Sequence, residues 1–427
     1  MRPARLATLL AVVVAIVLPA SFASAATSVG HYIVVLKSSI ADPGAVAADH
    51  ARRDGAQVRY VYRSAIKGYA ATIPTDRLDA VRSDSRVAYI SVDGVVHASA
   101  QTLPTGVDRI QGDVSSQLDG NGSGSVSVGV AVIDTGSGPH SDLNIAGGKN
   151  CQSGTSYDDQ NGHGTHVAGT IAALDDTAGV VGVAPGAPIY SVRVLDASGS
   201  GSWSEVICGI DWVTANAATL GIKVANMSLG GSGSDGSCAS DAMHNAICNS
   251  VNAGVTYVVA AGNSNTNFSG QVPAAYDQVL TVTAAADFNG QPGGGAAATC
   301  RSDVDDTAAD FSNYTTPTST DAGHTIAGPG VCIYSTWKGG GYNTISGTSM
   351  ATPHVTGAVA LCLSRTQANG GCAGMTPAQI MAKLRADASA QPSAYGFVGD
   401  PNHPISSGGR GHKTTRYYGF LVYVGGY

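Results

Sequence analysis

Residues 126–134 read VSVGVAVID, a short apolar segment that ends in a carboxylate. Its β-branched residues are typical of a buried strand. Four more apolar segments of strand length follow it, with helix-forming stretches between them. Strands that alternate with helices predict an α/β fold, in which a mostly parallel sheet carries helices on both faces. We expect strands at 126–133, 189–194, 224–227, 256–260 and 279–284, and helices at 163–174, 202–218 and 240–253.

A separate α+β unit is predicted before this region. Residues 29–97 give the order strand, helix, strand, strand, helix, strand, which is the order of ferredoxin-like domains. Its end runs into a connector rich in Ser, Ala, Gln and Thr at 98–105. The strands are expected at 31–37, 58–62, 68–73 and 87–92, and the helices at 43–55 and 75–83.

The first 25 residues have the three parts of a secretory signal. Arg2 and Arg5 form a basic start, an apolar run extends over 6–18, and Ala23-Ser24-Ala25 offers a small-residue cleavage site. The alternative is a membrane anchor, but this run is short for a bilayer and the cleavage site follows it directly. We therefore expect a secreted, extracellular product with no membrane attachment after signal removal.

Charge is unevenly distributed along the chain, and it argues against nucleic acid as a partner. Residues 26–100 carry nine Lys and Arg against seven Asp, a net charge of +2, whereas residues 101–427 have a net charge of −11. Phosphate binding needs basic patches, which an acidic main region does not favour.

The eight cysteines all lie beyond residue 150. An even number in an exported chain indicates disulfides, and we expect at least two. Eight cysteines allow on the order of 100 pairings, so the sequence leaves the pairing open. A mixture of bridges and buried free thiols is the alternative. No Cys-x-x-Cys pattern occurs, which disfavours a zinc site.

Three segments place reactive side chains at the ends of predicted elements. Asp134 in VIDTG follows a strand, His163 in NGHGTHVAG lies between glycines before a helix, and Ser349 in SGTSMATPHV begins an apolar helix. Each has an ordinary interpretation, as a turn residue, a packed histidine or a helix cap. The nearby His166 is expected to be buried and hydrogen-bonded, since the Glu of a His-Glu-x-x-His zinc motif is missing.

Taken together, the segments resemble the subtilisin family. VIDTG, HGTHVAG, NMSLGG, AAGN and GTSMATPHV occur in that family's order over residues 101–385, and YSVRVLDASGSGSW looks closest to the proteinase K and aqualysin branch. The resemblance implies a three-layer subtilisin-like fold. It also implies a secreted serine endopeptidase with broad specificity, favouring apolar or aromatic residues before the scissile bond.

The resemblance also implies a role for each residue. Ser349 attacks the scissile carbonyl, His163 takes and returns the proton, and Asp134 orients His163. The side-chain amide of Asn263 and the backbone N–H of Ser349 hold the oxyanion. Substrate contacts are implied for two edge segments, a pocket and a more distant aromatic residue: Gly199, Ser200, Gly201, Ser228, Leu229, Gly230, Ala260, Ala261, Gly262 and Trp203.

By the same resemblance, residues 26–100 are an inhibitory prodomain that is cut from the rest between Ala100 and Gln101. The expected organisation is a signal peptide at 1–25, the prodomain at 26–100, a catalytic domain at 101–400 and a Gly/Tyr-rich tail of uncertain role at 401–427. A monomer is expected, with protein and peptide substrates and its own prodomain as partners.

No catalytic cofactor is expected. Structural calcium is, because the family often binds it through Asp and backbone carbonyls. The insertion predicted on the surface at 287–310 disturbs one region where such sites occur, so no ligand is assigned. Two other functions are weighed: a catalytically inactive binding protein of the same fold, and a surface protein that works through its tail. The presence of Asp134, His163, Asn263 and Ser349 opposes the first, and the tail's short length the second.

Overall fold

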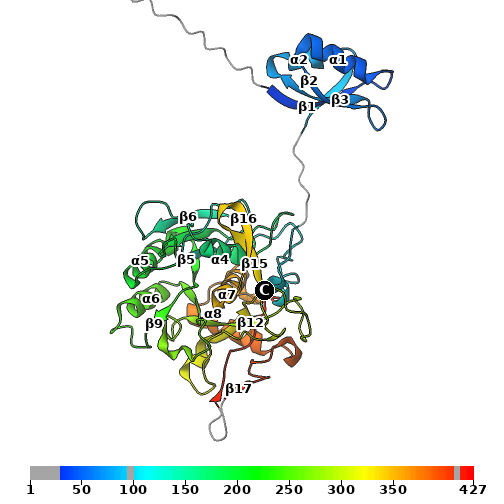
Figure 1. Cartoon of the computed structure of the whole chain (residues 1–427). Coiled ribbons are helices and arrows are strands. Elements are labelled where there is room, and N and C mark those ends of the chain that lie inside the picture. The colour runs from blue at the N-terminus through cyan, green and yellow to red at the C-terminus, as the bar shows by residue number, and fades with distance from the viewer. Residues whose placement is uncertain (1–28, 94–100, 408–413) are drawn as a thin grey trace, which may run out of the picture. The chain divides into compact units, whose positions relative to one another are not determined.

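The computed structural model describes residues 29–93, 101–407 and 414–427. The chain forms two compact units, Met1–Ala98 and Ser99–Tyr427 (Figure 1). The predicted signal peptide and the predicted cleavage site after Ala100 lie outside the described residues. No helix within the described ranges is long and apolar enough to cross a membrane.

The smaller unit has the predicted order of elements and forms a four-stranded sheet in the order β2-β3-β1-β4 with antiparallel pairing. Its core joins both helices to the sheet through Val34, Tyr69, Val46 and Val81. The predicted helix at 75–83 begins as the 3-10 turn Thr75–Arg77. The elements are β1 (Val29–Leu36), α1 (Pro43–Asp54), β2 (Gln57–Tyr62), β3 (Gly68–Pro74), α2 (Leu78–Arg82) and β4 (Val87–Val92).

The larger unit is built on a sheet that, among the described residues, has eight strands in the order β13-β12-β10-β8-β5-β7-β6, with β14 also paired to β12. All pairs are parallel except β12 with β13. The five predicted strands are confirmed. The strands are β5 (Gly129–Asp134), β6 (Ile145–Asn150), β7 (Ile189–Arg193), β8 (Ile222–Met227), β10 (Thr256–Ala260), β12 (Leu280–Ala286), β13 (Thr307–Ala308) and β14 (Thr325–Pro329).

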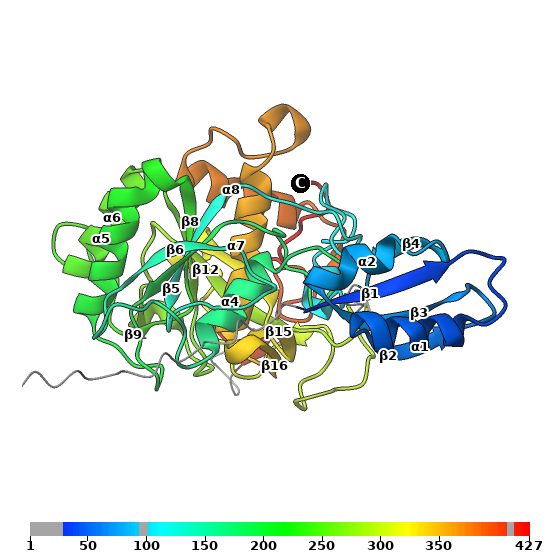
Figure 2. The same cartoon turned by 90° about the horizontal axis from the view of Figure 1, so that it is seen from above.

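Alternation along the buried strands produces three layers. In β5, Val130 and Val132 belong to one core and Ala131 and Ile133 to another, because successive side chains point to opposite faces. The first core includes residues of α4, α7 and α8 and the second those of α5 and α6 (Figures 1 and 2). The helices are α4 (His163–Ala172), α5 (Trp203–Leu220), α6 (Ala242–Asn252), α7 (Thr348–Leu363) and α8 (Pro377–Ser389).

Shorter elements complete the larger unit. They are the helix α3 (Thr105–Arg109), the antiparallel pairs β9 (Gly231–Ser232) with β11 (Gln271–Val272), β15 (Ile333–Trp337) with β16 (Gly341–Ile345) and β17 (Ser406–Ser407) with β18 (Thr414–Thr415), and 3-10 turns at Phe268–Gly270, Thr320–His324, Lys338–Gly340, Gln367–Asn369 and Ser393–Tyr395.

The end of the chain packs into the larger unit. Tyr418, Val422 and Tyr427 are each at most 2% exposed, and Tyr427 donates its hydroxyl to Asp387 on α8 at 2.6 Å. The Gly/Tyr-rich composition of this segment did not predict where it would pack. Tyr418 and Tyr427 are core residues whose hydroxyls have polar partners, Arg416 and Asp387, which is how a buried tyrosine avoids an unsatisfied group.

The segment 287–310, expected as a surface insertion, is exposed only in its middle. Its ends carry the buried Asp287, Asp305 and Asp306. Arg109, 1% exposed, lies 3.1 Å from Asp287 Oδ2 and 2.8 Å from Asp306 Oδ1. The expectation was therefore wrong for the two ends, because a buried cation draws the acidic residues inward.

Four disulfides cross-link the larger unit, and the described residues contain no free cysteine. The expectation of at least two bridges is confirmed, and the alternative with free thiols is excluded. The pairs are Cys151–Cys208, Cys238–Cys248, Cys300–Cys332 and Cys362–Cys372.

The buried charge cluster predicts a large effect of one substitution. Arg109→Ala removes the cation that both Asp287 and Asp306 face, and leaving buried carboxylates uncompensated costs about 3–5 kcal/mol. We expect the free energy of unfolding in denaturant to fall by that amount. Lys223→Ala, at an exposed position of β8, is the control and should change it by less than about 0.5 kcal/mol. An equal, small effect of both variants would contradict the assignment.

Candidate active site

Asp134 and His163 meet at the carboxyl end of the sheet. Asp134 ends β5 and is fully buried, and His163 begins α4. The Nδ1 atom of His163 lies 2.7 Å from Asp134 Oδ1, which also accepts the backbone N–H of Thr135. A carboxylate bonded to Nδ1 holds the proton there and leaves Nε2 with a lone pair for a general base.

Glycine at position 164 allows this approach. A Cβ atom at Gly164 would lie 1.9 Å from the carbonyl oxygen of Gly136 and 3.1 Å from Asp134 Cβ. No side chain fits in that space, so the first turn of α4 can touch the loop after β5 only with glycine here. Steric crowding therefore explains why the last residue of the Gly-His-Gly pattern, Gly164, carries no side chain.

A buried aspartate that the sequence analysis missed holds the loop before α4. Asp159 Oδ1 accepts from Thr135 Oγ1 and from the backbone N–H of Gly162, and Oδ2 accepts from the N–H and hydroxyl of Thr165. The hydroxyl of Thr135 in turn accepts the N–H of Gly164 at 2.9 Å. One carboxylate therefore ties the loop after β5 to the start of α4. Asp159 lies three residues before the N-cap Gly162, outside the usual capping position, so the sequence carried no clear signal for it.

The pKa of His163 is raised above its ordinary value. Burial lowers this pKa, but the charge of Asp134 and the hydrogen bond to it outweigh burial, with a further contribution from Asp159. The ring is a stronger base than a free imidazole and is neutral only above its raised pKa.

Ser349 lies in the first turn of α7 and is held against an edge segment. Its hydroxyl donates to the carbonyl of Ser228 at 3.2 Å, and the Ser228 hydroxyl donates to the carbonyl of Ser349 at 2.8 Å. α7 has 16 residues, so its N-terminus places a positive partial charge and free N–H groups beside this hydroxyl.

The side chain of Asn263 is oriented by Thr348. Its Oδ1 accepts the backbone N–H of Thr348 at 2.8 Å and the hydroxyl at 2.9 Å. Nδ2 is therefore the donor that remains. A Cβ atom at Gly347 would lie 3.5 Å from Asn263 Nδ2 and 3.6 Å from the backbone N of Ser349. The two N–H groups thus border the same small space, which glycine keeps open. Thr348 was not predicted as a site residue.

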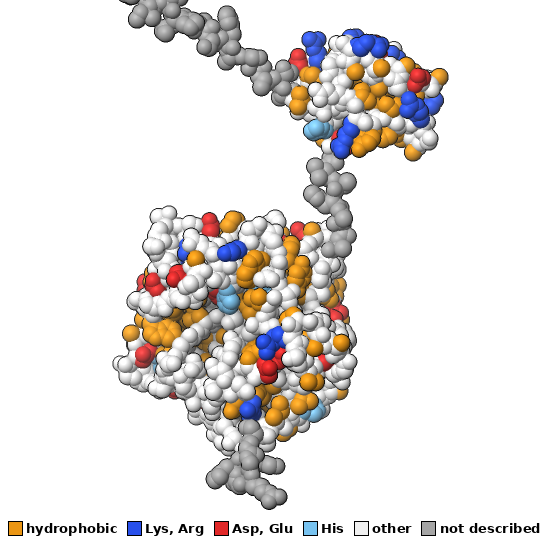
Figure 3. Space-filling view, viewed as in Figure 1, with side chains coloured by type: hydrophobic (Ala, Val, Ile, Leu, Met, Phe, Trp, Pro, Cys, Tyr) orange, Lys and Arg blue, Asp and Glu red, His pale blue; other side chains and the backbone are white. Residues whose placement is uncertain are grey.

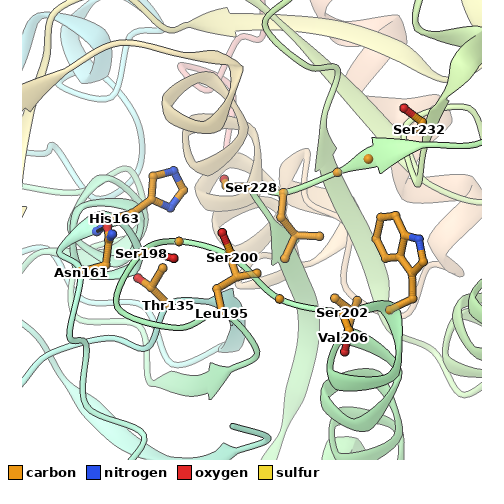
Figure 4. A pocket seen from close by; sticks show the side chains of 16 residues that line it. Thr135, Asn161, His163, Leu195, Ser198, Ser200, Ser202, Val206, Ser228 and Ser232 are labelled. Atoms are coloured by element: carbon orange, nitrogen blue, oxygen red, sulfur yellow. Dashed lines mark hydrogen bonds between the residues drawn. The ribbon is translucent and has the colours of Figure 1, made fainter.

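His163 opens into a cleft of about 830 Å³, which we call the main cleft. Figure 4 shows His163 at one end and Ser232 at the other. The predicted contact residues on the two edge segments and Trp203 all line it, together with Leu195 and Val206, which were not predicted: Thr135, Asn161, His163, Leu195, Ser198, Gly199, Ser200, Gly201, Ser202, Trp203, Val206, Ser228, Leu229, Gly230, Gly231 and Ser232.

A smaller pocket of about 200 Å³, the inner pocket, lies beside Ser349 and Asn263. Ala260 and Gly262 line it as expected, and no carboxylate does. Ala261 is fully buried in the core and does not line the pocket. Leu229 and Gly230 line both the pocket and the main cleft, so the two cavities share this edge segment as a wall.

Among the described residues, no cluster of His and Cys side chains beside Asp134, His163 and Ser349 could hold a metal ion. His166 is fully buried and its Nε2 bonds the carbonyl of Ile333 at 2.9 Å, as expected. Elsewhere in the described chain, Cys238, His244 and Cys248 lie close together, but the two cysteines form a disulfide and cannot also act as thiolate ligands.

A profile of the subtilase family matches residues 125–416. The chain belongs to the subtilase family. A second profile, described as peptidase inhibitor I9, matches residues 31–99, the smaller unit. The family resemblance and the three-layer fold inferred from the five sequence motifs are thus confirmed, and the subtilase family is one of serine endopeptidases.

Related proteins include the alkaline protease of Alkalihalobacillus alcalophilus, 41% identical over 66% of this chain and 66% of that protein. Subtilisin DY of Bacillus licheniformis is 41% identical over 62% and 86%, and subtilisin NAT of Bacillus subtilis subsp. natto 38% identical over 70% and 71%. The chain thus spans about two thirds of the length of the alkaline protease it matches. The crystal structure of a cold adapted subtilisin-like serine proteinase has a TM-score of 0.53 at 32% identity, covering 77% of this chain and 99% of that one. These relatives do not single out the proteinase K branch.

The raised pKa of His163 predicts the pH profile. Hydrolysis needs the neutral ring, so kcat should rise with pH through a pKa above about 6.5. Asp134→Asn removes the charge that raises it, and the acidic limb should move to lower pH while kcat falls by about 10⁴. Asp158→Asn, at an exposed neighbouring position, should leave the limb in place. A limb that stays fixed in Asp134→Asn would refute the electrostatic cause.

Proposed function

We propose that the mature protein is a secreted subtilase that hydrolyses peptide bonds through an acyl-enzyme on Ser349. The observation that carries this proposal is the pair formed by buried Asp134 and His163, which lies at a cleft whose lining residue Ser228 is hydrogen-bonded to Ser349. A binding protein without catalytic activity would not need the Asp134–His163 pair. It would also not need the Asn263 side chain to be oriented so that its Nδ2 can donate.

The proposed chemical steps assign one role to each of these groups. Ser349 Oγ attacks the scissile carbonyl and its proton passes to His163 Nε2. The C–N bond then breaks as the imidazolium returns the proton to the leaving amine, and water repeats the sequence to release the acid. Asp134 stabilises the imidazolium and stays ionised. No cofactor takes part in these steps.

Asn263 Nδ2 and the N–H of Ser349 stabilise the oxyanion in this proposal. Both donors are fixed before substrate binds, by Thr348 and by α7, so they need no reorganisation when charge develops. The loss of about 10²–10³ in kcat on removing such an amide is the known value for subtilisin, a relative.

The inner pocket selects the residue before the scissile bond. Its walls of Ala260, Gly262 and backbone leave room for an apolar or aromatic side chain, and with no carboxylate it offers nothing to Lys or Arg. An extended peptide would pair with the edge segments 199–201 and 228–230, since exposed strand edges bind peptides as added strands.

The smaller unit acts on the same cleft as an inhibitor. It matches peptidase inhibitor I9, and the +2 charge of residues 26–100 complements the −11 of residues 101–427. Opposite net charges speed association, and the effect weakens with salt.

Export is supported by the predicted signal peptide and by the four disulfides, which persist in oxidising compartments. The proposed location is extracellular.

Changing one hydroxyl tests the nucleophile. Ser349→Ala should abolish peptide hydrolysis and leave a folded protein, with the junction of Ala100 and Gln101 uncut if maturation is autocatalytic. Intact mass and activity measure both results. Ser346→Ala is the matched control, a hydroxyl three residues earlier on the same segment, and should retain hydrolysis. Hydrolysis retained by Ser349→Ala would remove the triad assignment.

We also propose a structural calcium site at the start of the larger unit. Gln101 Nε2 lies 2.6–3.4 Å from the carbonyl oxygens of Leu174, Ala178 and Val180, while its own Oε1 is buried with no hydrogen-bond partner. The buried Asp142 approaches the same loop through the N–H of Val180. The side-chain amide of Gln101 has two N–H protons, so it cannot donate a separate hydrogen bond to each of the three carbonyl oxygens. With the Gln101 amide turned over, these oxygens fit the ligand set that Ca²⁺ prefers.

Chelation tests this site. In a Ser349→Ala background, removing Ca²⁺ with EDTA should lower Tm by about 5–15 °C, as expected for a ligand at 100–1,000 times its Kd. Asp142→Asn keeps the side-chain shape but should reduce this difference, whereas Asp158→Asn should not. An unchanged Tm on chelation would rule out the site.

A further inference from the structure

The main cleft continues beyond Ser232 into a second hollow of about 450 Å³, which we call the outer hollow. Both cavities share Trp203 and Ser232 as walls. Because Figure 4 places Ser232 at the end of the main cleft opposite His163, the outer hollow extends the cleft away from the reacting atoms. It is lined by Trp203, Ile207, Ser232, Gly233, Ser234, Asp235, Gly236, Ser240, Asp241, Ala242, Met243, Val272 and Tyr276.

The outer hollow has carboxylates and no balancing Lys or Arg among its lining residues. Asp235 and Asp241 are both exposed to solvent within it. Burial raises the pKa of Asp235, and the neighbouring charges of Asp277 and Asp321 raise it further, against the lowering effect of His244. His324 faces Asp277 and Asp321, with its Nε2 3.8 Å from each. The one neighbouring charge that lowers the pKa of Asp235 thus comes from His244.

The His244 ring lies next to Asp235. The ring is 1% exposed, stacks on Tyr276 at 3.9 Å, and its Nε2 lies 2.5 Å from Gln278 Oε1. Nε2 is therefore the atom that donates to Gln278. Nδ1 has no hydrogen-bond partner and lies 3.8 Å from Asp235 Oδ1. The unpartnered Nδ1 thus points at a carboxylate that lines the outer hollow, although His244 itself does not line it.

The walls are held in place before any ligand binds. Asp241 Oδ1 accepts the N–H of His244 at 2.7 Å, which caps α6, and the hydroxyl of Tyr276 at 3.0 Å. The disulfide Cys238–Cys248 ties the preceding loop to the same helix. A preformed site binds with little ordering cost.

We propose that the outer hollow is a substrate subsite for a Lys or Arg side chain, N-terminal to the scissile bond. This rests on the proposed function and adds to it a second specificity, opposite in character to the apolar inner pocket. The exposed Trp203 and the half-buried Ile207 cover the methylene stem, and the charged end donates to Asp235 and Asp241. A peptide advances about 3.3 Å per residue along the cleft, so the test below samples the fourth, fifth and sixth residues before the cut.

Quenched fluorescent peptides test the subsite. A series with Phe before the cut carries Lys, Gln or Glu at the fourth, fifth or sixth residue before it. At one of these positions kcat/KM should be about three- to five-fold higher for Lys than for Gln, with Glu below Gln, and 1 M NaCl should reduce the ratio. Asp235→Asn/Asp241→Asn should bring the Lys to Gln ratio near one. Asn still caps a helix, so the double variant keeps α6.

The control is Asp211→Asn, an exposed carboxylate on α5 that lines neither cavity, and it should keep the full ratio. Equal kcat/KM for Lys and Gln at all three positions would overturn the subsite, as would a ratio unchanged in the double variant. Failure of the wild-type protein to cleave even the Gln peptides would instead overturn the proposed function, so the two failures are distinct.

Discussion

The contact between Gly164 and the carbonyl of Gly136 is the constraint on which the site depends. It allows the first turn of α4 to lie against the end of β5, and it thereby sets the distance between Asp134 and His163. Hydrogen bonds of Asp159 hold the same two segments together from the buried side. Because both segments belong to the three-layer body, its packing fixes the geometry of the Asp134–His163 pair, and substrate binding does not have to create it.

Sequence reasoning recovered the strands whose apolar residues alternate between two cores, as in β5. It failed for β6, where IAGGKN has no apolar pattern and the strand exists because β7 pairs with it. The ends of 287–310 were misjudged for a similar reason, since acidic composition is typical of a surface and the buried partner, Arg109, is about 180 residues away in the chain. Non-local partners of this kind leave no local signal.

Within the site, the reactive residues could be recognised because their neighbours are constrained in type. Glycines flank His163, and small residues surround Ser349. Each motif therefore contains several residues of restricted type in a short stretch, which makes it easy to recognise. The residues that orient them were harder to find. Thr348 bonds Asn263, which is 85 residues away in the chain. Asp159 joins the nearby Gly162 and Thr165 to Thr135, which belongs to a different loop. A Thr or Asp near a helix start is common and does not by itself indicate such a role. Ala261 shows the reverse case: strand alternation turns its methyl group into the core, although both of its neighbours line the inner pocket.

The disulfides are distributed unequally between the two units. All eight cysteines belong to the larger unit, and the smaller one has none, so its fold rests on one small apolar core. Units of about 70 residues without cross-links are marginally stable and open often. In the proposed maturation, cutting the link exposes the inhibitor's open state to the protease, whereas the cross-linked body resists the same attack. Under that proposal activation is irreversible, and the lifetime of the free inhibitor, more than its affinity, sets the delay between cutting and proteolysis.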